Sequence, residues 1–340
     1  MLLNFVVRSV RDGDLEDLLN LAGQFNLLNL PNHKPTLTRK IEKSQSSFSG
    51  DLPIEESEYT LVCEDVDNKF IVGCATIIGK KGVPESPNYS FKILKKERFS
   101  RDLGVGFIHQ ILRLKIDTDG STEVGGLVID KGYRRRPEKL GKLISLSRFS
   151  YIGLKPERFT ENLHVEMAPP FTDDGKSEFW ESLGRRFTGM PYQEADALSQ
   201  QNKEFIRSLF PEEDIYLCLL DAKARLVVGR VGPDTQPALH LLEGIGFRYK
   251  EEIDPFDGGP HLGCAAADVK VIKDGRALKF DANGAADFGD EALVGVERAD
   301  GFVGGRTFCH IEGAKVFLPA KSVDRLQLES GETVFVYVME

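Results

Sequence analysis

Hydrophobic and polar residues alternate along this chain in patterns that predict strands interleaved with helices. Residues 5–22 predict a strand, an acidic helix start and a helix with leucines on one side. Residues 59–78 predict two strands joined by an Asp-Asn turn. Residues 237–247 predict a helix that stops at Gly246, and its apolar face consists of Ala238, Leu241, Leu242 and Ile245.

Between these segments, a strand leads through a basic turn into an amphipathic helix. The strand, residues 124–129, contains Gly125 and Gly126, which weaken a strand and indicate close approach of another backbone or an extended ligand. Pro137 suits a first helical position, so we expect the helix to begin just after the triplet Arg134-Arg135-Arg136. Its predicted buried face comprises Leu140, Leu143, Ile144, Ser147 and Tyr151.

Such a helix start is a favourable place for a diphosphate. Unpaired backbone N–H groups, the positive end of the helix dipole and the guanidinium groups all attract phosphate oxygens. A basic triplet beside a helix is also a common feature of solvated surfaces. This segment alone therefore leaves both interpretations open.

These segments, in this order, resemble the GNAT acyltransferases, which grip coenzyme A with a strand, a pyrophosphate turn and a helix. The resemblance implies an α/β (α+β) fold: a GNAT-like mixed sheet flanked by helices, with a large insertion and a small C-terminal β domain. In the turn, Gly141 takes the last glycine position of the family, but Lys139 replaces the earlier glycine. The resemblance assigns acyl-CoA binding to Leu127, Val128, Ile129, Arg134, Arg135, Arg136, Gly141 and Lys142.

Four parts are expected along the chain. They are a GNAT-like part with the acyl-CoA site (1–151), an insertion (152–231), the closing GNAT motif (232–262) and a β-rich C-terminal domain (263–340). The insertion is too long for an ordinary connection. Its apolar residues recur at helical steps and predict a core of its own: Phe179, Trp180, Leu183, Phe187, Phe205, Ile206, Leu209 and Phe210.

Composition narrows the classes of function. In 340 residues, 41% hydrophobic and 9% aromatic residues support a sizeable core, and a net charge of −9 argues against a general nucleic-acid binder. The five cysteines are odd in number and scattered, as expected for reduced thiols in a cytoplasm rather than disulfides or a metal site. We expect no signal peptide, no membrane partner and no metal cofactor, because no segment has the required pattern.

Further motifs narrow the resemblance to one family. The segments Phe179-Trp-x-x-Leu-Gly-Arg185 and Phe256-Asp-Gly-Gly-Pro260, together with residues 145–149, 164–167, 194–198, 211–216 and 246–254, look like the arginine N-succinyltransferases of bacterial arginine catabolism. The resemblance implies transfer of a succinyl group from succinyl-CoA, or another acyl-CoA, to the α-amine of arginine or ornithine. It also implies a homodimer or larger oligomer.

The resemblance assigns Leu127 to contact with succinyl-CoA, although Leu127 could also be an ordinary buried leucine. It places a proton-donating histidine in a Gly-x-Val-His-Pro-x-Thr segment, where this chain has Gly232. We therefore consider Glu166 and His164 as catalytic candidates, against the alternative of a paired structural carboxylate and a structural histidine. His240 points away from its helix's apolar face and is expected at the surface.

Three functions remain open at this point. The first is an active N-acyltransferase in which another residue or a water replaces the histidine. The second is a catalytically weak regulatory or partner subunit that binds coenzyme A or an amino acid. The third is a structural subunit without a ligand, which the altered turn and the missing histidine favour.

Overall fold

The computed structural model describes residues 3–25, 30–199, 202–284 and 287–339. The chain folds into two compact units. Unit 1 comprises Met1–Lys80, Thr122–Leu163 and Ala265–Glu340, and unit 2 comprises Lys81–Ser121 and His164–Cys264. Strands and helices are mixed throughout, which confirms the α/β class. The compact units cut across the four predicted parts, because residues 81–121 group with the insertion and residues 265–340 with the N-terminal part.

Unit 1 is built on a mixed sheet with the strand order β12-β15-β11-β14-β13-β1-β2-β3-β6. β13 pairs antiparallel with β1, Val7 opposite Gly304, so the C-terminal strands extend the N-terminal sheet. The elements are β1 (Phe5–Ser9), η1 (Asp12–Asp14), α1 (Leu15–Ala22), α2 (Lys34–Ser49), β2 (Glu58–Asp65), β3 (Phe70–Ile78), β6 (Thr122–Ile129), η2 (Lys131–Tyr133), α3 (Leu140–Leu154), η3 (Pro156–Arg158), η6 (Ala266–Asp268), α10 (Lys270–Lys273), β11 (Arg276–Phe280), β12 (Asp290–Arg298), β13 (Gly301–Glu312), β14 (Lys315–Phe317), α11 (Ala320–Leu326) and β15 (Thr333–Val338).

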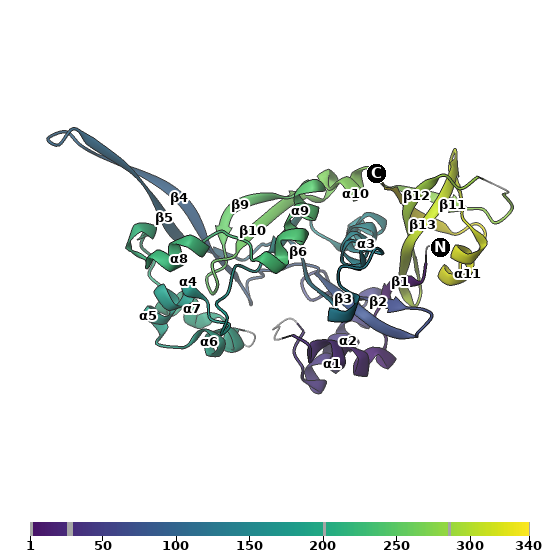
Figure 1. Ribbon diagram of the computed structural model, residues 1–340, viewed down its shortest axis with the longest axis horizontal. Coiled ribbons are helices and arrows are strands. Elements are labelled where there is room, and N and C mark those ends of the chain that lie inside the picture. Colours follow the sequence, from purple (N-terminus) through teal and green to yellow (C-terminus); the bar gives the residue numbers. More distant parts are fainter. Residues whose placement is uncertain (1–2, 26–29, 200–201, 285–286, 340) are drawn as a thin grey trace. The chain divides into compact units, whose positions relative to one another are not determined.

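Helices cover both faces of the central strands of unit 1. Figure 1 shows α1 and α2 on one face of β2 and β3, and α3 on the other. On the first face, leucines of α1 and α2 pack with Val62, Cys74 and Val128. On the second face, the predicted apolar side of α3 is buried. The strand-helix pair, the hairpin and the face of α3 that were predicted from periodicity are thus confirmed.

The start of α3 was predicted wrongly. The helix begins at Leu140 rather than at Pro137. Arg135 and Lys139 have left-handed backbone angles, with φ of 59° and 52°, so the chain turns twice before it becomes helical. A residue before proline also disfavours the helical region, which keeps Arg136 out of a continuous helix.

Unit 2 contains a sheet with the strand order β7-β10-β9-β4-β5-β8, antiparallel from β10 to β8 and packed against short helices. β7 begins in unit 1 and enters unit 2 at His164. The elements are β4 (Asn88–Ser100), β5 (Val105–Asp117), β7 (Asn162–Glu166), α4 (Glu178–Ser182), α5 (Gly184–Thr188), α6 (Tyr192–Ser199), α7 (Glu204–Leu209), β8 (Ile215–Tyr216), η4 (Leu217–Leu219), α8 (Ala222–Val227), η5 (Pro233–Thr235), α9 (Gln236–Gly244), β9 (Arg248–Ile253) and β10 (Pro260–Ala265).

Most of the predicted apolar core of the insertion exists, and β4, β5 and β9 share it, but Leu209 is 45% exposed. Phe91 packs against Phe179 and Phe210, and the ring of Trp180 stacks on Phe256 at 5.3 Å. Phe187 was predicted to lie on the same helical face, but its side chain is 42% exposed. The non-helical angles of Leu183 separate α4 from α5, which changes the direction of the side chains that follow.

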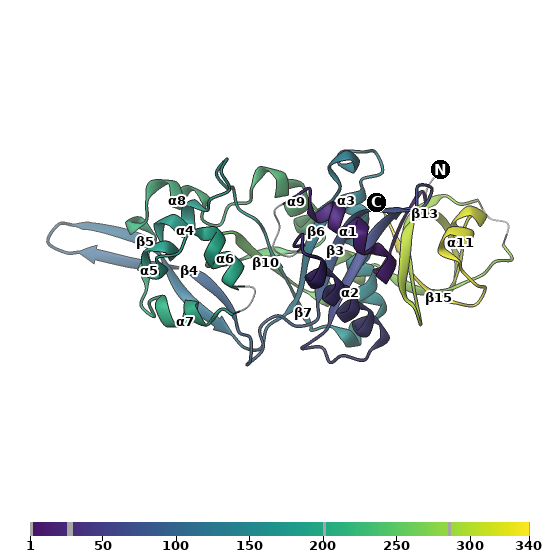
Figure 2. The same cartoon turned by 90° about the horizontal axis from the view of Figure 1, so that it is seen from below.

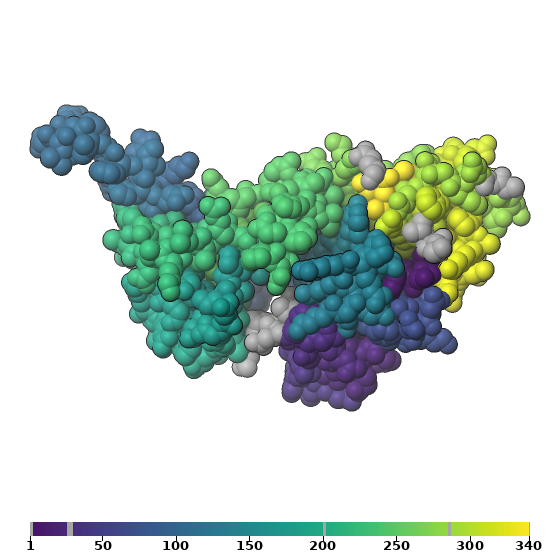
Figure 3. Space-filling view, viewed as in Figure 1, coloured from purple at the N-terminus to yellow at the C-terminus, as the bar shows by residue number. Residues whose placement is uncertain are grey.

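The β4–β5 hairpin projects beyond the rest of unit 2 (Figures 1 and 2). Figure 3 shows its tip surrounded by solvent on the visible face. Four apolar side chains near this tip are largely exposed: Phe99 at 69%, Leu103 at 75%, Phe107 at 63% and Ile108 at 65%. Among the described residues, no helix is long and apolar enough to span a lipid bilayer.

Candidate active site

The first candidate site lies on β6 in unit 1. Cys74 of β3 pairs with Val128, and Thr76 pairs with Gly125, so Ala75 alone faces both Gly126 and Leu127. This two-against-one arrangement is a β-bulge, which leaves backbone groups without ladder partners. Gly126 has φ of +60°, and a Cβ atom there would lie 3.0 Å from the hydroxyl of Thr76. Glycine is therefore required for both the backbone angle and the close packing.

A pocket opens beside this bulge. Its lining is largely apolar and comes from α1, α2, β2, β3 and β6: Leu18, Leu30, Leu37, Lys40, Ile41, Thr60, Cys74, Thr76 and Gly126. The hydroxyl oxygen of Thr60 is buried and has no hydrogen-bond partner among the described residues. The pocket has room for about one water molecule, and the Thr60 hydroxyl is a polar group in its largely apolar lining.

The start of α3 carries unneutralised positive charge. Arg135 and Arg136 are exposed, and no ion pair among the described residues joins Arg134, Arg135, Arg136 or Lys139 to a carboxylate. Burial lowers the pKa of Lys142, and the charges of Lys139 and Arg306 lower it further. This repulsion between like charges favours an anion beside the helix start.

The guanidinium groups of the triplet are oriented by neighbouring residues. Arg134 donates from Nε to the carbonyl of Ile129 at 3.0 Å and lies over the ring of Phe25. Arg136 stacks on Tyr133, with 3.8 Å between the guanidinium carbon and the ring centre. At Gly141, a Cβ atom would meet only Ile129, at 4.0 Å. A ligand can thus approach the backbone of the first helical turn.

The strand residues assigned to acyl-CoA have different surroundings. Leu127 is half-buried at the bulge, whereas Val128 and Ile129 are buried. The Val128 side chain packs in the core beneath α1 and α2. A ligand on β6 would therefore contact the backbone of Val128 rather than its side chain.

One residue of this site was not predicted from the sequence. Arg148 of α3 is 4% exposed, and its Nη1 donates to the carbonyl of Gly125 at 2.9 Å. Burial lowers the pKa of its guanidinium to about 9. The sequence did contain a signal, because Arg148 lies four residues after Ile144 on the predicted buried face of the helix.

The second candidate site lies in unit 2 and contains the two predicted catalytic residues. His164 and Glu166 stand two residues apart on β7, and His164 Nε2 lies 3.3 Å from Glu166 Oε1. Lys81 Nζ contacts the same oxygen at 2.7 Å, and His261 Nε2 lies 3.8 Å from it. The imidazole rings of His164 and His261 are perpendicular at 4.7 Å. Lys81 and His261 were not predicted, because they are far from β7 in the sequence.

The charges in this cluster have a definite pattern. Burial raises the pKa of Glu166, but Lys81 and the hydrogen bond with His164 outweigh it and lower that pKa well below its ordinary value. Burial lowers the pKa of His261 to about 3, so its imidazole is neutral. Neither ring nitrogen of His261 has a hydrogen-bond partner among the described residues. Glu166 is thus a stable carboxylate that can hold a cation or orient a histidine.

Among the described residues, this cluster also has the geometry of a possible metal site. One ligand atom from each of His164, Glu166 and His261 lies within 4.8 Å of the others. The ammonium of Lys81 contacts Oε1 of this carboxylate at 2.7 Å.

The position of the family's histidine lies close to the end of β7. Gly232 donates its N–H to the carbonyl of Ala168 at 2.9 Å. Its φ of −64° is open to any residue, but a Cβ atom would lie 2.7 Å from the carbonyl oxygen of Pro169. No side chain fits there unless the backbone shifts. His240, as predicted, is exposed on α9.

Three half-buried carboxyl groups of unit 2 have raised pKa values. Burial, followed by the charge of Asp254, raises the pKa of Asp196 to about 7, and burial with Glu166 raises that of Asp254 to about 6. Burial and Asp254 raise the pKa of Asp257 well above its ordinary value. Asp257 also accepts the N–H of Gly259 at 2.7 Å, as expected of a turn residue. Such a group would be stabilised by a cationic ligand.

The chain is similar to proteins of one known family. The family described as arginine N-succinyltransferase beta subunit matches residues 5–271. The arginine N-succinyltransferase of Enterobacter sp. (strain 638) is 35% identical over 334 residues, which is 97% of this chain and 96% of that protein. The corresponding protein of Salmonella paratyphi B is 34% identical over the same shares.

Among solved structures, the chain resembles arginine/ornithine succinyltransferase subunit AI from Pseudomonas aeruginosa. The TM-score is 0.84 at 26% identity, and the match covers 98% of each chain. Likeness of fold and sequence thus extends over nearly the whole length. The chain belongs to the arginine N-succinyltransferase family, a family of acyl-CoA-dependent transferases.

Proposed function

We propose that this chain transfers the succinyl group of succinyl-CoA to the α-amine of arginine or ornithine. The observation that carries this proposal is the start of α3, where several cations without carboxylate partners stand beside a bulged strand. That combination suits a diphosphate followed by an extended pantetheine arm. Leu127, Val128 and Ile129 would bind the arm, and Arg134, Arg135, Arg136, Gly141 and Lys142 the diphosphate.

The reaction places three demands on the protein. The acceptor amine must lose a proton before it attacks the thioester carbon, the carbonyl oxygen needs a hydrogen-bond donor, and the departing thiolate needs a proton. A new C–N bond then forms while the C–S bond breaks. Backbone N–H groups at the Gly126–Leu127 bulge are suited to the second demand, because a bulge frees them from strand pairing.

We assign the amine proton to His164, with Glu166 as its partner. The 3.3 Å contact between His164 Nε2 and Glu166 Oε1 supports this pairing, since a carboxylate orients an imidazole and stabilises its protonated form. The lowered pKa of Glu166 makes it a poor base but a good orienting group. His164 would then do the work that the family gives to the histidine absent at Gly232.

The acidic residues of unit 2 support a cationic acceptor. Asp196, Asp254 and Asp257 are carboxylates with raised pKa values, and a guanidinium or ammonium group would relieve their mutual repulsion. Arginine and ornithine both carry such a group at the end of the side chain. This charge pattern is the reason to prefer them over a neutral amino acid.

A second candidate function is a catalytically weak subunit that binds coenzyme A as a regulator or partner. The observation in its favour is Gly232, where Pro169 leaves no room for the histidine that the family's pattern contains. In this case the site on β6 would still bind coenzyme A. Only acyl transfer would be lost.

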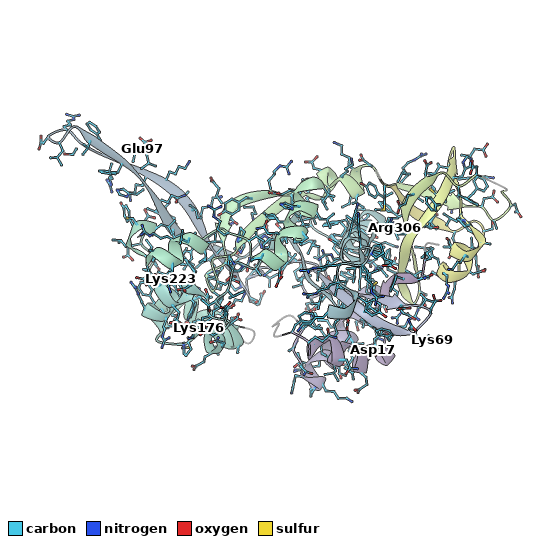
Figure 4. The ribbon with its side chains drawn as sticks, viewed as in Figure 1. Asp17, Lys69, Glu97, Lys176, Lys223 and Arg306 are labelled. Atoms are coloured by element: carbon cyan, nitrogen blue, oxygen red, sulfur yellow. The ribbon has the colours of Figure 1, made fainter. Side chains whose placement is uncertain are left out.

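We also propose that the chain acts as a homodimer or larger oligomer in the cytoplasm. The related solved protein is called subunit AI, which supports an assembly. The apolar tip of the β4–β5 hairpin supports it further, because exposed patches of this kind commonly contact another subunit. Figure 4 shows Glu97 on the same projecting hairpin. No disulfide joins the five cysteines, which all lie in the described residues, and this is compatible with a reducing compartment.

The decisive experiment is mass spectrometry of the products formed from several acyl-CoAs and a mixture of amino acids. The proposal expects N-succinylarginine or N-succinylornithine to dominate. Tight binding of coenzyme A without any acylated amino acid would instead favour the regulatory function.

A further inference from the structure

Arg148 is an unusual residue for the interior of unit 1. It is 4% exposed, yet no hydrogen bond or ion pair joins it to a carboxylate among the described residues. Removing a guanidinium from water without a counter-ion is costly. Arg158 of the same unit has such a counter-ion, because its Nη1 lies 2.7 Å from the carboxylate of Glu297.

The hydrogen bonds of Arg148 leave part of its guanidinium unused. Nη1 donates to the carbonyl of Gly125 at 2.9 Å, and Nη2 to the hydroxyl of Ser145 at 2.9 Å. Nε makes a longer contact with the carbonyl of Ser145 at 3.4 Å. A guanidinium has five N–H groups, so one remains on each terminal nitrogen. Two such N–H groups can bind a carboxylate in the bidentate manner.

The position of this guanidinium relates it to the proposed acyl-CoA site on β6. Its partner Gly125 directly precedes the bulge at Gly126 and Leu127. The proposed function places the thioester at that bulge. An acyl chain that continues along β6 would therefore bring its far end toward the guanidinium of Arg148.

We propose that Arg148 binds the terminal carboxylate of the acyl group and so selects succinyl-CoA over acyl-CoAs that lack this charge. The inference rests on the proposed function only for the place of acyl-CoA on β6. The bound carboxylate supplies the counter-ion that the buried guanidinium lacks. Ser145 and Gly125 position the guanidinium, and they leave its remaining N–H groups for the ligand.

If Arg148 has only a structural role, a different experimental result is expected. Its bonds to Ser145 and Gly125 also connect α3 to β6, so its loss could disturb the strand. Such damage would weaken the binding of all acyl-CoAs to the same degree. A carboxylate-binding role instead changes the ratio between a charged and an uncharged donor.

The test compares succinyl-CoA with butyryl-CoA, whose four-carbon acyl group has no carboxylate. Calorimetry gives the affinity of each, and turnover with arginine gives each kcat/KM. In the unmodified protein we expect at least tenfold preference for succinyl-CoA in binding. Arg148→Met should remove most of this preference and leave butyryl-CoA within about twofold, because only the charge-assisted bonds are lost. Arg148→Lys should retain part of it.

Arg158→Met is the matched control, since it removes an arginine of the same unit that already has a carboxylate partner. It should leave the succinyl-to-butyryl ratio unchanged. Equal losses for both donors in Arg148→Met would overturn the inference. So would equal affinities of the unmodified protein for the two donors, a measurement that remains if the variant does not fold. Because binding is measured without turnover, a protein that prefers succinyl-CoA but acylates no amine would refute the proposed function and not this inference.

Discussion

Lys81 Nζ lies 2.7 Å from Glu166 Oε1, the same oxygen that contacts His164 Nε2 at 3.3 Å. This ammonium is the largest favourable influence on the Glu166 carboxylate, whose pKa is well below the ordinary 4.5. A carboxyl group with a lowered pKa stabilises the fold above its unfolded pKa. That contribution is lost as the pH falls through the folded pKa, so the pair is fully effective at neutral pH.

Lys81→Met should therefore raise the pKa of Glu166 and destabilise the protein at pH 7 by about 1–3 kcal/mol, because a half-buried carboxylate loses its counter-ion. NMR titration of the carboxyl carbons and urea unfolding measure the two effects. The double variant Lys81→Met with Glu166→Gln should regain most of the stability. An unchanged pKa of Glu166 in the single variant would contradict the pairing.

Loss of charge at the helix start should weaken coenzyme A binding. Charge-assisted bonds to phosphate are each worth about 1.5–3 kcal/mol, so Arg134→Ala with Arg135→Ala should raise the Kd at least tenfold in calorimetric titration. The matched control is Arg276→Ala with Lys279→Ala, which removes two exposed cations from β11 of the same unit. Equal affinities of the two double variants would make the triplet an ordinary solvated surface.

Restoring the family's histidine should not restore a proton donor. A side chain at Gly232 meets the Pro169 carbonyl oxygen at 2.7 Å, so Gly232→His and Gly232→Ala should both lose about 1–3 kcal/mol of stability through overpacking. Thermal unfolding provides the measurement. If Gly232→His kept full stability and gained turnover, the segment would have to shift freely, and the missing histidine would be the cause of slow catalysis.

His164→Gln should lower turnover by about 10²–10⁴-fold, the usual worth of general acid-base help. Coenzyme A affinity should stay unchanged, because the residues assigned to it are in the other unit. His240→Gln provides the control, since His240 is exposed on α9. Full activity of His164→Gln would reduce His164 to a structural histidine.

We expect the tip of the β4–β5 hairpin to form the contact between subunits. Phe107→Ser with Ile108→Ser replaces two side chains that are 63% and 65% exposed, so the monomer fold should survive while an interface built on the tip weakens. Light scattering at micromolar concentrations should change from a dimer or larger oligomer to a monomer. Leu226→Ser, at 75% exposure on α8, tests whether any exposed apolar residue has this effect. An unmodified protein that is already monomeric would rule out the oligomer.

Individual strands and helices could be predicted from the sequence, because they depend on residues that are close together in the chain. The strand and helix of residues 5–22, the hairpin of residues 59–78 and the buried face of α3 follow from hydrophobic periodicity, and the structure has all three. Periodicity failed where a single residue changes the backbone direction. Lys139 delays α3 by its left-handed angle, and Leu183 separates α4 from α5 and leaves Phe187 exposed.

The sequence by itself determined the family, the class of fold and the segment suited to a diphosphate, because these are carried by contiguous motifs. Only the tertiary structure decided which side chains meet. Lys81 and His261 join His164 and Glu166 from distant parts of the chain, and Arg148 reaches Gly125 across 23 residues. Pairing and burial in three dimensions set the charge states of these groups. No spacing along the chain encodes those contacts.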